Sequence, residues 1–312
     1  MAIAWACQQV AHRESEGDML DKITRGKIKT PHAILIYSKD GMGKSTFASQ
    51  APNPVFLGTE QGTNYLDVAR FPTPKTWADV DACLDSLLKE KHDFKTIVID
   101  SLDWLEPLLH QKICLEYKVK TLELAAGGYG KGYMIALDEF VKFRVKLNEL
   151  REAKGMNIIL IAHSQVKTFQ DPHNQIAYDK FEIKLHKAAS AMFREYVDAV
   201  LYAGIEVFSS GDGKTLKTFA DDSRYLFTSA SAGYDAKNRM GLPPRIELSW
   251  EAFEAACQPE SASLVIERIN ALIPQVTPEI AIKIGEYLTK AGTNLVQLKA
   301  LETRIETIIK GN

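Results

Sequence analysis

The sequence lacks a large net charge of either sign, a long apolar run and any close pair of cysteines. It carries 38 Lys and Arg against 40 Asp and Glu among 312 residues, a formal net charge of -2. A nucleic acid would therefore have to be contacted by local loops rather than by a polycationic surface. No apolar run approaches the length of a membrane span, and the N-terminal region is charged, so we expect a cytoplasmic protein without a membrane partner.

The few cysteines exclude two further classes of protein. The four are far apart and include no C-x-x-C pair: Cys7, Cys83, Cys114 and Cys257. Neither a zinc site nor a disulfide framework is indicated, and reduced thiols are the expectation. With 46% hydrophobic and 25% charged residues, the composition is otherwise that of an ordinary globular protein, and 312 residues predict about two domains.

A glycine loop lies between an apolar run, residues 33–37, and a segment compatible with a helix. It reads Ser38-Lys39-Asp40-Gly41-Met42-Gly43-Lys44-Ser45-Thr46. Strand, glycine loop and helix in this order predict a phosphate-binding loop, in which residues 40–46 bind ATP. Gly41 and Gly43 let the backbone turn its N–H groups toward an anion, and the helix dipole favours negative charge there.

Two side chains of this loop have expected roles, and one position departs from the usual pattern. Lys44 would reach the β- and γ-phosphates, and the Ser45 hydroxyl would be a ligand of Mg²⁺. Ser38 stands where G-x-x-x-x-G-K-[ST] has its first glycine. A positive φ at Ser38 would cost about 1–2 kcal/mol, which weakens the match without cancelling it. The alternative is a glycine-rich turn that binds no ligand.

The chain predicts an α/β fold with a mainly parallel central sheet. Short apolar runs at 33–37, 54–58, 96–100, 157–162 and 199–203 alternate with helical patterns at 77–89, 102–117 and 133–154. A hairpin around Gly211-Asp212-Gly213-Lys214 would extend the sheet with antiparallel strands. After about residue 259 only helices are expected. The predicted units are a lead-in (1–30), an ATPase core (31–258) and a small C-terminal helical region (259–312).

Polar residues follow three of the expected strands, at the carboxyl edge where open α/β sheets bind ligands. Asp100 would hold Mg²⁺ through a water, or would cap the helix that follows it. Glu60 is placed to orient water against the γ-phosphate, or is an exposed turn residue. Gln165 and His163 could sense the γ-phosphate, although His163 could equally be a structural histidine.

In this order the elements resemble the RecA/RadA-type ATPase core. They are more closely similar to phage-encoded AAA-type nucleotide-binding proteins, RecA-like relatives that include single-strand annealing recombinases. The resemblance covers about residues 30–255 and includes the segment 234–243. It implies that Lys44, Ser45 and Asp100 are nucleotide and Mg²⁺ ligands and that Glu60 activates water. It also implies that Gln165 couples the γ-phosphate to a second DNA loop.

Two loops are candidates for nucleic-acid contact. The second DNA loop would be 166–185, where basic and aromatic side chains alternate: Lys167, Phe169, Lys180 and Lys184, with His173, Tyr178 and Phe181. Counted with its acidic residues this loop has no net charge. The first would be 118–132, in which four glycines surround Tyr129 and Lys131. Its alternative is a flexible connection without a ligand.

Lys237 and Arg239 are candidates for cations that one subunit contributes to a neighbour's ATP. The alternative for both is a surface salt bridge.

We expect an ATP- and Mg²⁺-dependent RecA-like ATPase that binds single-stranded DNA in phage recombination or annealing. The expected partners are single-stranded DNA and further copies of the chain, with ATP between subunits, and a single-strand-binding protein is a further candidate. If phage-encoded, the protein would work in the host cytoplasm. Two alternatives stay open: a nucleotide-gated loader or scaffold with slow turnover, and a small-molecule kinase, against which the absence of an arginine-rich lid argues.

Overall fold

The computed structural model describes residues 20, 23–26, 28–170, 177–210, 217–258 and 261–310. Three sequence predictions lie outside these residues in whole or in part. They are the first 19 residues of the N-terminal lead-in, the hairpin turn at 211–214, and the centre of the predicted second DNA loop, which includes His173.

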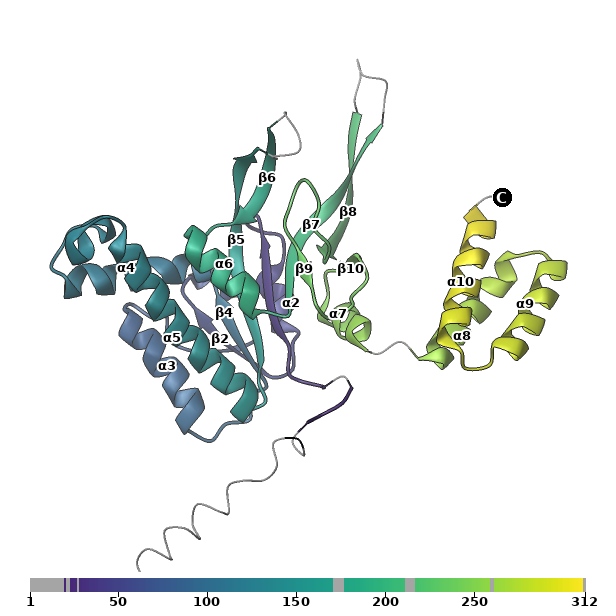
Figure 1. Ribbon diagram of the computed structural model, residues 1–312, viewed down its shortest axis with the longest axis horizontal. Helices are drawn as coiled ribbons and strands as arrows, with labels where there is room; N and C mark the ends of the chain where they lie inside the picture. The colour runs from purple at the N-terminus through teal and green to yellow at the C-terminus, as the bar shows by residue number, and fades with distance from the viewer. Residues whose placement is uncertain are drawn as a thin grey trace, which may run out of the picture.

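A single mixed sheet runs through the described core (Figure 1). Its strand order is β10-β8-β7-β1-β5-β4-β2-β3, with β6 paired to β5 and β9 paired to β7. The strands β7, β1, β5, β4, β2 and β3 run parallel, and β8, β10, β6 and β9 are antiparallel to their neighbours. The bounds of the strands are β1 (Ala33–Ser38), β2 (Pro54–Gly58), β3 (Ala69–Arg70), β4 (Thr96–Asp100), β5 (Asn157–Phe169), β6 (Tyr178–Ile183), β7 (Ala199–Ser210), β8 (Lys217–Phe227), β9 (Lys237–Asn238) and β10 (Arg245–Glu247).

Helices cover both faces of this sheet. The core helices are α2 (Lys44–Ser49), α3 (Trp77–Lys89), α4 (Leu102–Glu116), α5 (Lys131–Ala153), α6 (Lys187–Tyr196) and α7 (Trp250–Cys257), with short 3-10 turns η1 (Gln61–Thr63) and η2 (Leu122–Gly127). Strand β1 shows the two-sided burial, because Leu35 faces one hydrophobic core and Ile36 the other. The first core contains side chains of α3, α4, α5 and α6, and the second contains side chains of α2 and α7.

Local sequence explains where these helices begin. Thr76 and Asp79 form a capping box at the start of α3, in which each side chain accepts a hydrogen bond from the other's backbone. Gly43 and Gly130 precede α2 and α5 with positive φ, a conformation that other residues rarely adopt. Along α5, Phe140, Phe143, Leu147 and Leu150 are buried at three- and four-residue steps, as the periodicity predicts.

The C-terminal helices pack around a hydrophobic core of their own. They are α8 (Ala262–Leu272), the 3-10 turn η3 (Ile273–Gln275), α9 (Pro278–Ala291) and α10 (Leu295–Lys310). Val265, Ile269 and Leu298 are fully buried in this third core. The predicted boundaries of the domains stay a prediction.

The fold class predicted from the sequence, an α/β fold with a mainly parallel central sheet, an antiparallel extension and C-terminal helices, is confirmed. In one region the structure differs from the prediction. Strand β5 does not end at residue 162 but continues to Phe169 and pairs with β6, so most of the described part of 166–185 is an antiparallel hairpin rather than a loop. Most of the side chains of this two-stranded ribbon beyond Gln165 are exposed or half-buried, so no apolar run marks it in the sequence.

Candidate functional site

The glycine loop has the backbone that the sequence predicts. Gly41 and Gly43 have φ of 70° and 102°. Ser38, the departure from the glycine pattern, is the buried last residue of β1, paired in register with His163 of β5, and it is not among the residues with positive φ. The free-energy cost of a positive φ at a residue other than glycine therefore does not apply to Ser38.

Lys44 lies buried at the start of α2, with 6% of its surface exposed. Its Nζ donates to the Ser38 carbonyl (3.3 Å), the Ser38 hydroxyl (3.1 Å) and the Lys39 carbonyl (3.0 Å). Burial lowers the pKa of this ammonium, and the nearby carboxylate of Asp100 partly offsets that effect. Among the described residues this ammonium, held over the loop, has no direct anionic partner, which suits it to receive phosphate oxygens.

Ser45 and Asp100 come together at the same edge. The Ser45 hydroxyl donates to Asp100 Oδ2 at 2.6 Å. Burial raises the pKa of Asp100, and the hydrogen bond from Ser45 opposes the rise. A hydroxyl and a carboxylate oxygen beside a phosphate-binding loop are the hard ligands that Mg²⁺ prefers. Within the described residues no cluster of three or more His, Cys, Asp or Glu side chains could hold a metal.

Glu60 lies next to this pair, two residues beyond β2. The Ser101 hydroxyl donates to Glu60 Oε1 at 3.0 Å, and burial raises the pKa of the Glu60 carboxyl. A carboxylate whose pKa is raised and which is held beside the phosphate loop is a plausible proton acceptor. Glu60, Asp100 and the phosphate loop therefore lie together at one edge of the sheet, as the sequence predicts. Their roles stay predictions.

His163 is tied to three acidic side chains. Its Nδ1 lies 2.9 Å from Asp103 Oδ2 and 3.9 Å from Glu60 Oε1, and its Nε2 lies 3.2 Å from Asp40 Oδ1. The hydrogen bond with Asp103 raises the pKa of His163. Burial opposes ionisation of Asp103, but hydrogen bonds from the His163 ring and backbone N–H hold its pKa below the usual value. His163 thus bridges the phosphate loop and the neighbourhood of Glu60.

The sequence interpretation missed Asp103. The spacing of Asp100 and Asp103 on either side of the start of α4 was a usable signal, because it places two carboxylates at one edge. The partner histidine, however, is 60 residues away along the chain. Only the pairing of β4 with β5 brings them together.

Gln165 lies on β5 beyond His163. Its side-chain amide donates to the Ile183 carbonyl of β6 at 3.3 Å. Gln165 therefore fastens the β5–β6 hairpin at its base, and its predicted role as a coupling residue stays a prediction.

The candidate DNA residues of the β5–β6 hairpin fall into two groups. Lys167 pairs with Glu182 at 3.3 Å, and Lys180 pairs with Asp235 at 2.5 Å with only 15% of its side chain exposed. Phe169 and Lys184 are exposed. Lys184 and Phe169 are therefore better placed for an external partner than Lys180.

The hairpin contacts the phosphate loop directly. The Lys39 ammonium lies 4.9 Å from the centre of the Phe181 ring of β6, a cation–π contact. The backbone N–H of Lys184 donates to the His163 carbonyl at 2.9 Å. A movement of the phosphate loop would therefore displace the β5–β6 hairpin as well.

The predicted first DNA loop is a folded turn. Leu122 and Ala125 of η2 are buried, whereas Tyr129 is fully exposed and Lys131 is exposed at the start of α5. A Cβ on Gly132 would meet the Leu122 carbonyl at 2.0 Å, so this glycine is required by packing.

Lys237 and Arg239 are placed differently from the prediction. Lys237 Nζ donates to the carbonyls of Arg194 (2.6 Å), Glu195 (3.0 Å) and Val197 (2.6 Å), at the C-terminal end of α6. Arg239 donates to the Glu195 carbonyl at 3.2 Å. All three protons of the Lys237 ammonium are used within the chain, where they satisfy the free carbonyls of a helix end. Within the described residues these contacts cap a helix end, and the predicted inter-subunit role of Lys237 and Arg239 stays a prediction.

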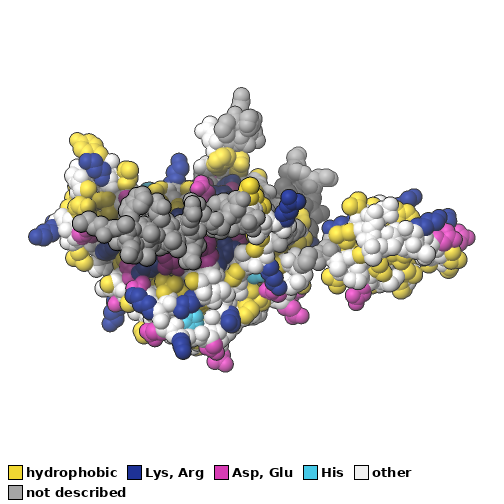
Figure 2. Space-filling model, turned by 60° about the horizontal axis from the view of Figure 1, so that its bottom comes forward, with side chains coloured by type: hydrophobic (Ala, Val, Ile, Leu, Met, Phe, Trp, Pro, Cys, Tyr) yellow, Lys and Arg dark blue, Asp and Glu magenta, His cyan; other side chains and the backbone are white. Residues whose placement is uncertain are grey.

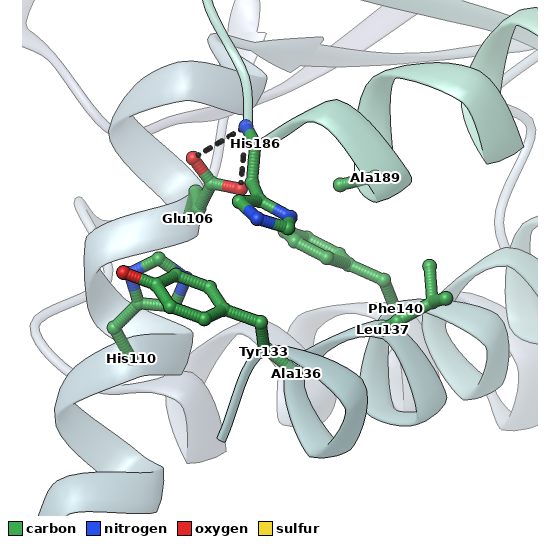
Figure 3. A pocket seen from close by; sticks show the side chains of 8 residues that line it. All are labelled: Glu106, His110, Tyr133, Ala136, Leu137, Phe140, His186 and Ala189. Atoms are coloured by element: carbon green, nitrogen blue, oxygen red, sulfur yellow. Dashed lines mark hydrogen bonds between the residues drawn. The ribbon is translucent and has the colours of Figure 1, made fainter. Parts of the chain in front are cut away.

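A second cluster of titratable groups lies between α4, α5 and α6 (Figure 3). The His186 backbone N–H donates to both carboxylate oxygens of Glu106 (3.1 and 3.2 Å), and the His186 ring stacks on Tyr133 with a centroid distance of 4.5 Å. Burial raises the pKa of Glu106 and lowers that of the neighbouring His110. This cluster fastens the start of α6, which follows the hairpin, to α4, which follows Asp100.

Comparisons with known proteins agree with this site. A family model described as an AAA domain matches residues 30–240, about two thirds of the chain. The chain is 26% identical over 137 residues to the SPbeta prophage-derived uncharacterized protein YorG of Bacillus subtilis (strain 168), a match over 42% of this chain and 40% of that protein. The match thus spans less than half the length of this relative.

Among solved structures, the chain is similar to the flagellar accessory protein FlaH from Methanocaldococcus jannaschii. The TM-score is 0.32 with 14% sequence identity, over 73% of this chain and 89% of that one. A likeness at this level says nothing of function. No helix in the described ranges is long and apolar enough to cross a membrane.

Proposed function

Because the chain belongs to the AAA domain family, whose model matches residues 30–240, we propose that it is an ATP- and Mg²⁺-dependent ATPase acting on single-stranded DNA in phage recombination or annealing. The observation that supports hydrolysis is the convergence of Lys44, the Ser45–Asp100 pair and Glu60 at one sheet edge. Phosphoryl transfer needs little more from a protein than positioning and stabilisation of charge, and these residues supply both.

The chain's own residues divide the chemistry among them. Lys44 exchanges its backbone carbonyl partners for the β- and γ-phosphates. Ser45 and Asp100 would hold the Mg²⁺, which would supply positive charge to neutralise the phosphates. Glu60 accepts a proton from the attacking water. Burial raises the pKa of its carboxyl, which brings that pKa closer to the pH at which the enzyme works and so favours general-base catalysis. His163 fixes the position of Glu60 relative to the loop.

The proposal of DNA contact rests on exposed side chains and their link to the loop. Phe169 and Tyr129 are exposed rings, and Lys131 and Lys184 are exposed cations, a combination suited to single strands. On the face drawn in Figure 2, Lys and Arg side chains are interspersed with Asp and Glu rather than gathered into one patch. Contact would therefore be local, as the net charge of -2 also requires.

The hairpin contacts suggest how ATP turnover would act on DNA. The Lys39–Phe181 contact and the Lys184–His163 backbone hydrogen bond connect the loop and the β5–β6 hairpin. Hydrolysis would change the hairpin's position and so release DNA. The proposal includes a homo-oligomer with ATP between subunits, a single-strand-binding protein as a further partner, and action in the host cytoplasm.

The test is the salt dependence of single-stranded DNA binding by Lys184→Ala. If Lys184 contacts a phosphate, the variant binds more weakly and the slope of log affinity against log salt falls by about 0.7. Lys95→Ala is the matched control, because Lys95 is exposed at the opposite, amino edge of the sheet, just before β4. Equal affinities for wild type and Lys184→Ala at every salt concentration would remove the hairpin from the proposal.

A further inference from the structure

Arg224 of β8 reaches the phosphate-binding loop from the side opposite the catalytic carboxylates. Its NH1 donates to the Met42 carbonyl at 3.2 Å, and its backbone lies opposite Ile205 of β7. The side chain is exposed, and it forms no ion pair in the part of the chain that the structure describes. Arg245, one strand away, is by contrast paired with Glu206 and lies over the Tyr225 ring.

The contact is close enough to restrict the loop. A Cβ on Gly43 would lie 3.3 Å from Arg224 NH1 and 3.4 Å from Leu248 Cδ2. The Leu248 backbone N–H donates to the Arg224 carbonyl at 2.9 Å, so the two residues form one wall against Gly43. Next to Gly43 this wall therefore presents the planar guanidinium of Arg224 beside the apolar side chain of Leu248.

The strand order decides which end of a nucleotide meets this wall. Glu60 follows β2, Asp100 ends β4 and His163 lies within β5, and these three strands are all on one side of β1 in the sheet. Arg224 and Leu248 come from β8 and the end of β10, on the other side of β1. With the γ-phosphate beside Glu60 and Asp100, the nucleoside end of ATP must extend toward the β8 side.

We propose that Arg224 and Leu248 bind the nucleoside end of ATP, with the Arg224 guanidinium stacked on the base. A guanidinium plane stacks well on aromatic rings, and Leu248 supplies the apolar contact that a base also needs. The inference rests on the proposed binding of ATP. It assigns to this chain's own β7–β8 hairpin a nucleotide contact that the sequence interpretation did not include.

The experiment measures binding of two probes, ATP and inorganic tripolyphosphate, to full-length Arg224→Ala and wild-type protein by calorimetry with Mg²⁺. Arg224→Ala is expected to bind ATP about tenfold more weakly, while tripolyphosphate binding changes less than twofold. Arg224→Lys keeps the charge but not the planar group, so it recovers only part of the loss. Arg245→Ala is the matched control and is expected to change neither affinity.

Two results would overturn the assignment. Wild-type affinity of Arg224→Ala for ATP removes the contact, and equal losses for ATP and tripolyphosphate show that Arg224 serves the phosphates instead. Failure of the wild type to bind ATP at all is a different result, because it refutes the proposed function itself. Thermal unfolding of Arg224→Ala at the wild-type temperature excludes misfolding as the cause of a loss.

Discussion

In the described part of the chain, Glu60 accepts a hydrogen bond from the Ser101 hydroxyl, and a substitution that tests its role should keep this contact. Glu60→Gln keeps a side-chain oxygen that can accept the same hydrogen bond and removes the basic carboxylate. We expect the rate of ATP hydrolysis to fall by about 100-fold or more, because a general base contributes about 10²–10⁴. ATP affinity, measured by calorimetry, should stay within about twofold of wild type. Turnover by Glu60→Gln at the wild-type rate would exclude Glu60 as the base.

His163 and Asp103 predict a pH-dependent part of the stability. The pKa of His163 is raised in the folded state, so its contribution is complete below the unfolded value of about 6.5 and is lost as pH rises through the higher folded pKa. The pKa of Asp103 is lowered, so its contribution is present above about pH 4 and is lost as pH falls through the lower folded pKa. The pair therefore stabilises most between about pH 4 and 6.5.

The measurement is urea unfolding of wild type and His163→Gln at several pH values. At pH 6, wild type should be more stable than His163→Gln by about 1 kcal/mol in the free energy of unfolding. This value is kept small because the His163 side chain is partly exposed, and the difference should decrease toward pH 9. The other charged groups facing His163 are Asp40, Glu60 and Lys44, and all are unchanged in this comparison. A difference that is constant over this range would contradict the charged pair.

Sequence alone could predict the gathering of Lys44, Ser45, Glu60 and Asp100. Each follows a recognisable strand of a parallel sheet, and parallel strands end at a common edge. Sequence could not predict that His163 bridges Asp103 and Asp40, or that Arg224 reaches Met42. Those contacts join residues far apart in the chain through side-chain geometry that no local pattern records.

At the level of single elements, Lys237 donates hydrogen bonds to the carbonyls at the end of helix α6. Lys237→Met keeps the apolar stem and removes three hydrogen bonds to the helix-end carbonyls. We expect the free energy of unfolding to fall by about 1–2 kcal/mol, while ATP turnover per folded molecule is unchanged. Thermal or urea unfolding measured beside hydrolysis separates the two roles. Loss of turnover with unchanged stability would restore the inter-subunit role.

The β5–β6 hairpin illustrates why one element was predicted as a loop. The strands β1, β2 and β4 are buried on both faces and read as continuous apolar runs. The outer half of β5 is exposed, with polar and apolar side chains mixed, so it lacks that signal. Its pairing with β6 is held by backbone hydrogen bonds, which every sequence can supply.

Across the whole molecule, the residues that the structure describes form three hydrophobic cores. Two lie on the opposite faces of the sheet, and the third lies within the C-terminal helices. The candidate site is formed by the ends of strands between the first two cores. Its geometry is therefore set by the strand order of the sheet. The apolar runs and the phosphate loop allowed the sequence to predict a mainly parallel sheet with the site at its carboxyl edge, but not the order of the strands.

ATP hydrolysis at the Lys44 loop is proposed to be linked to single-stranded DNA. The decisive measurement is steady-state ATP hydrolysis by the full-length chain with and without single-stranded DNA, with Lys44→Ala as the blank. We expect hydrolysis that DNA stimulates and that Lys44→Ala abolishes in both conditions. Hydrolysis indifferent to DNA, or activity that survives in Lys44→Ala, would contradict it.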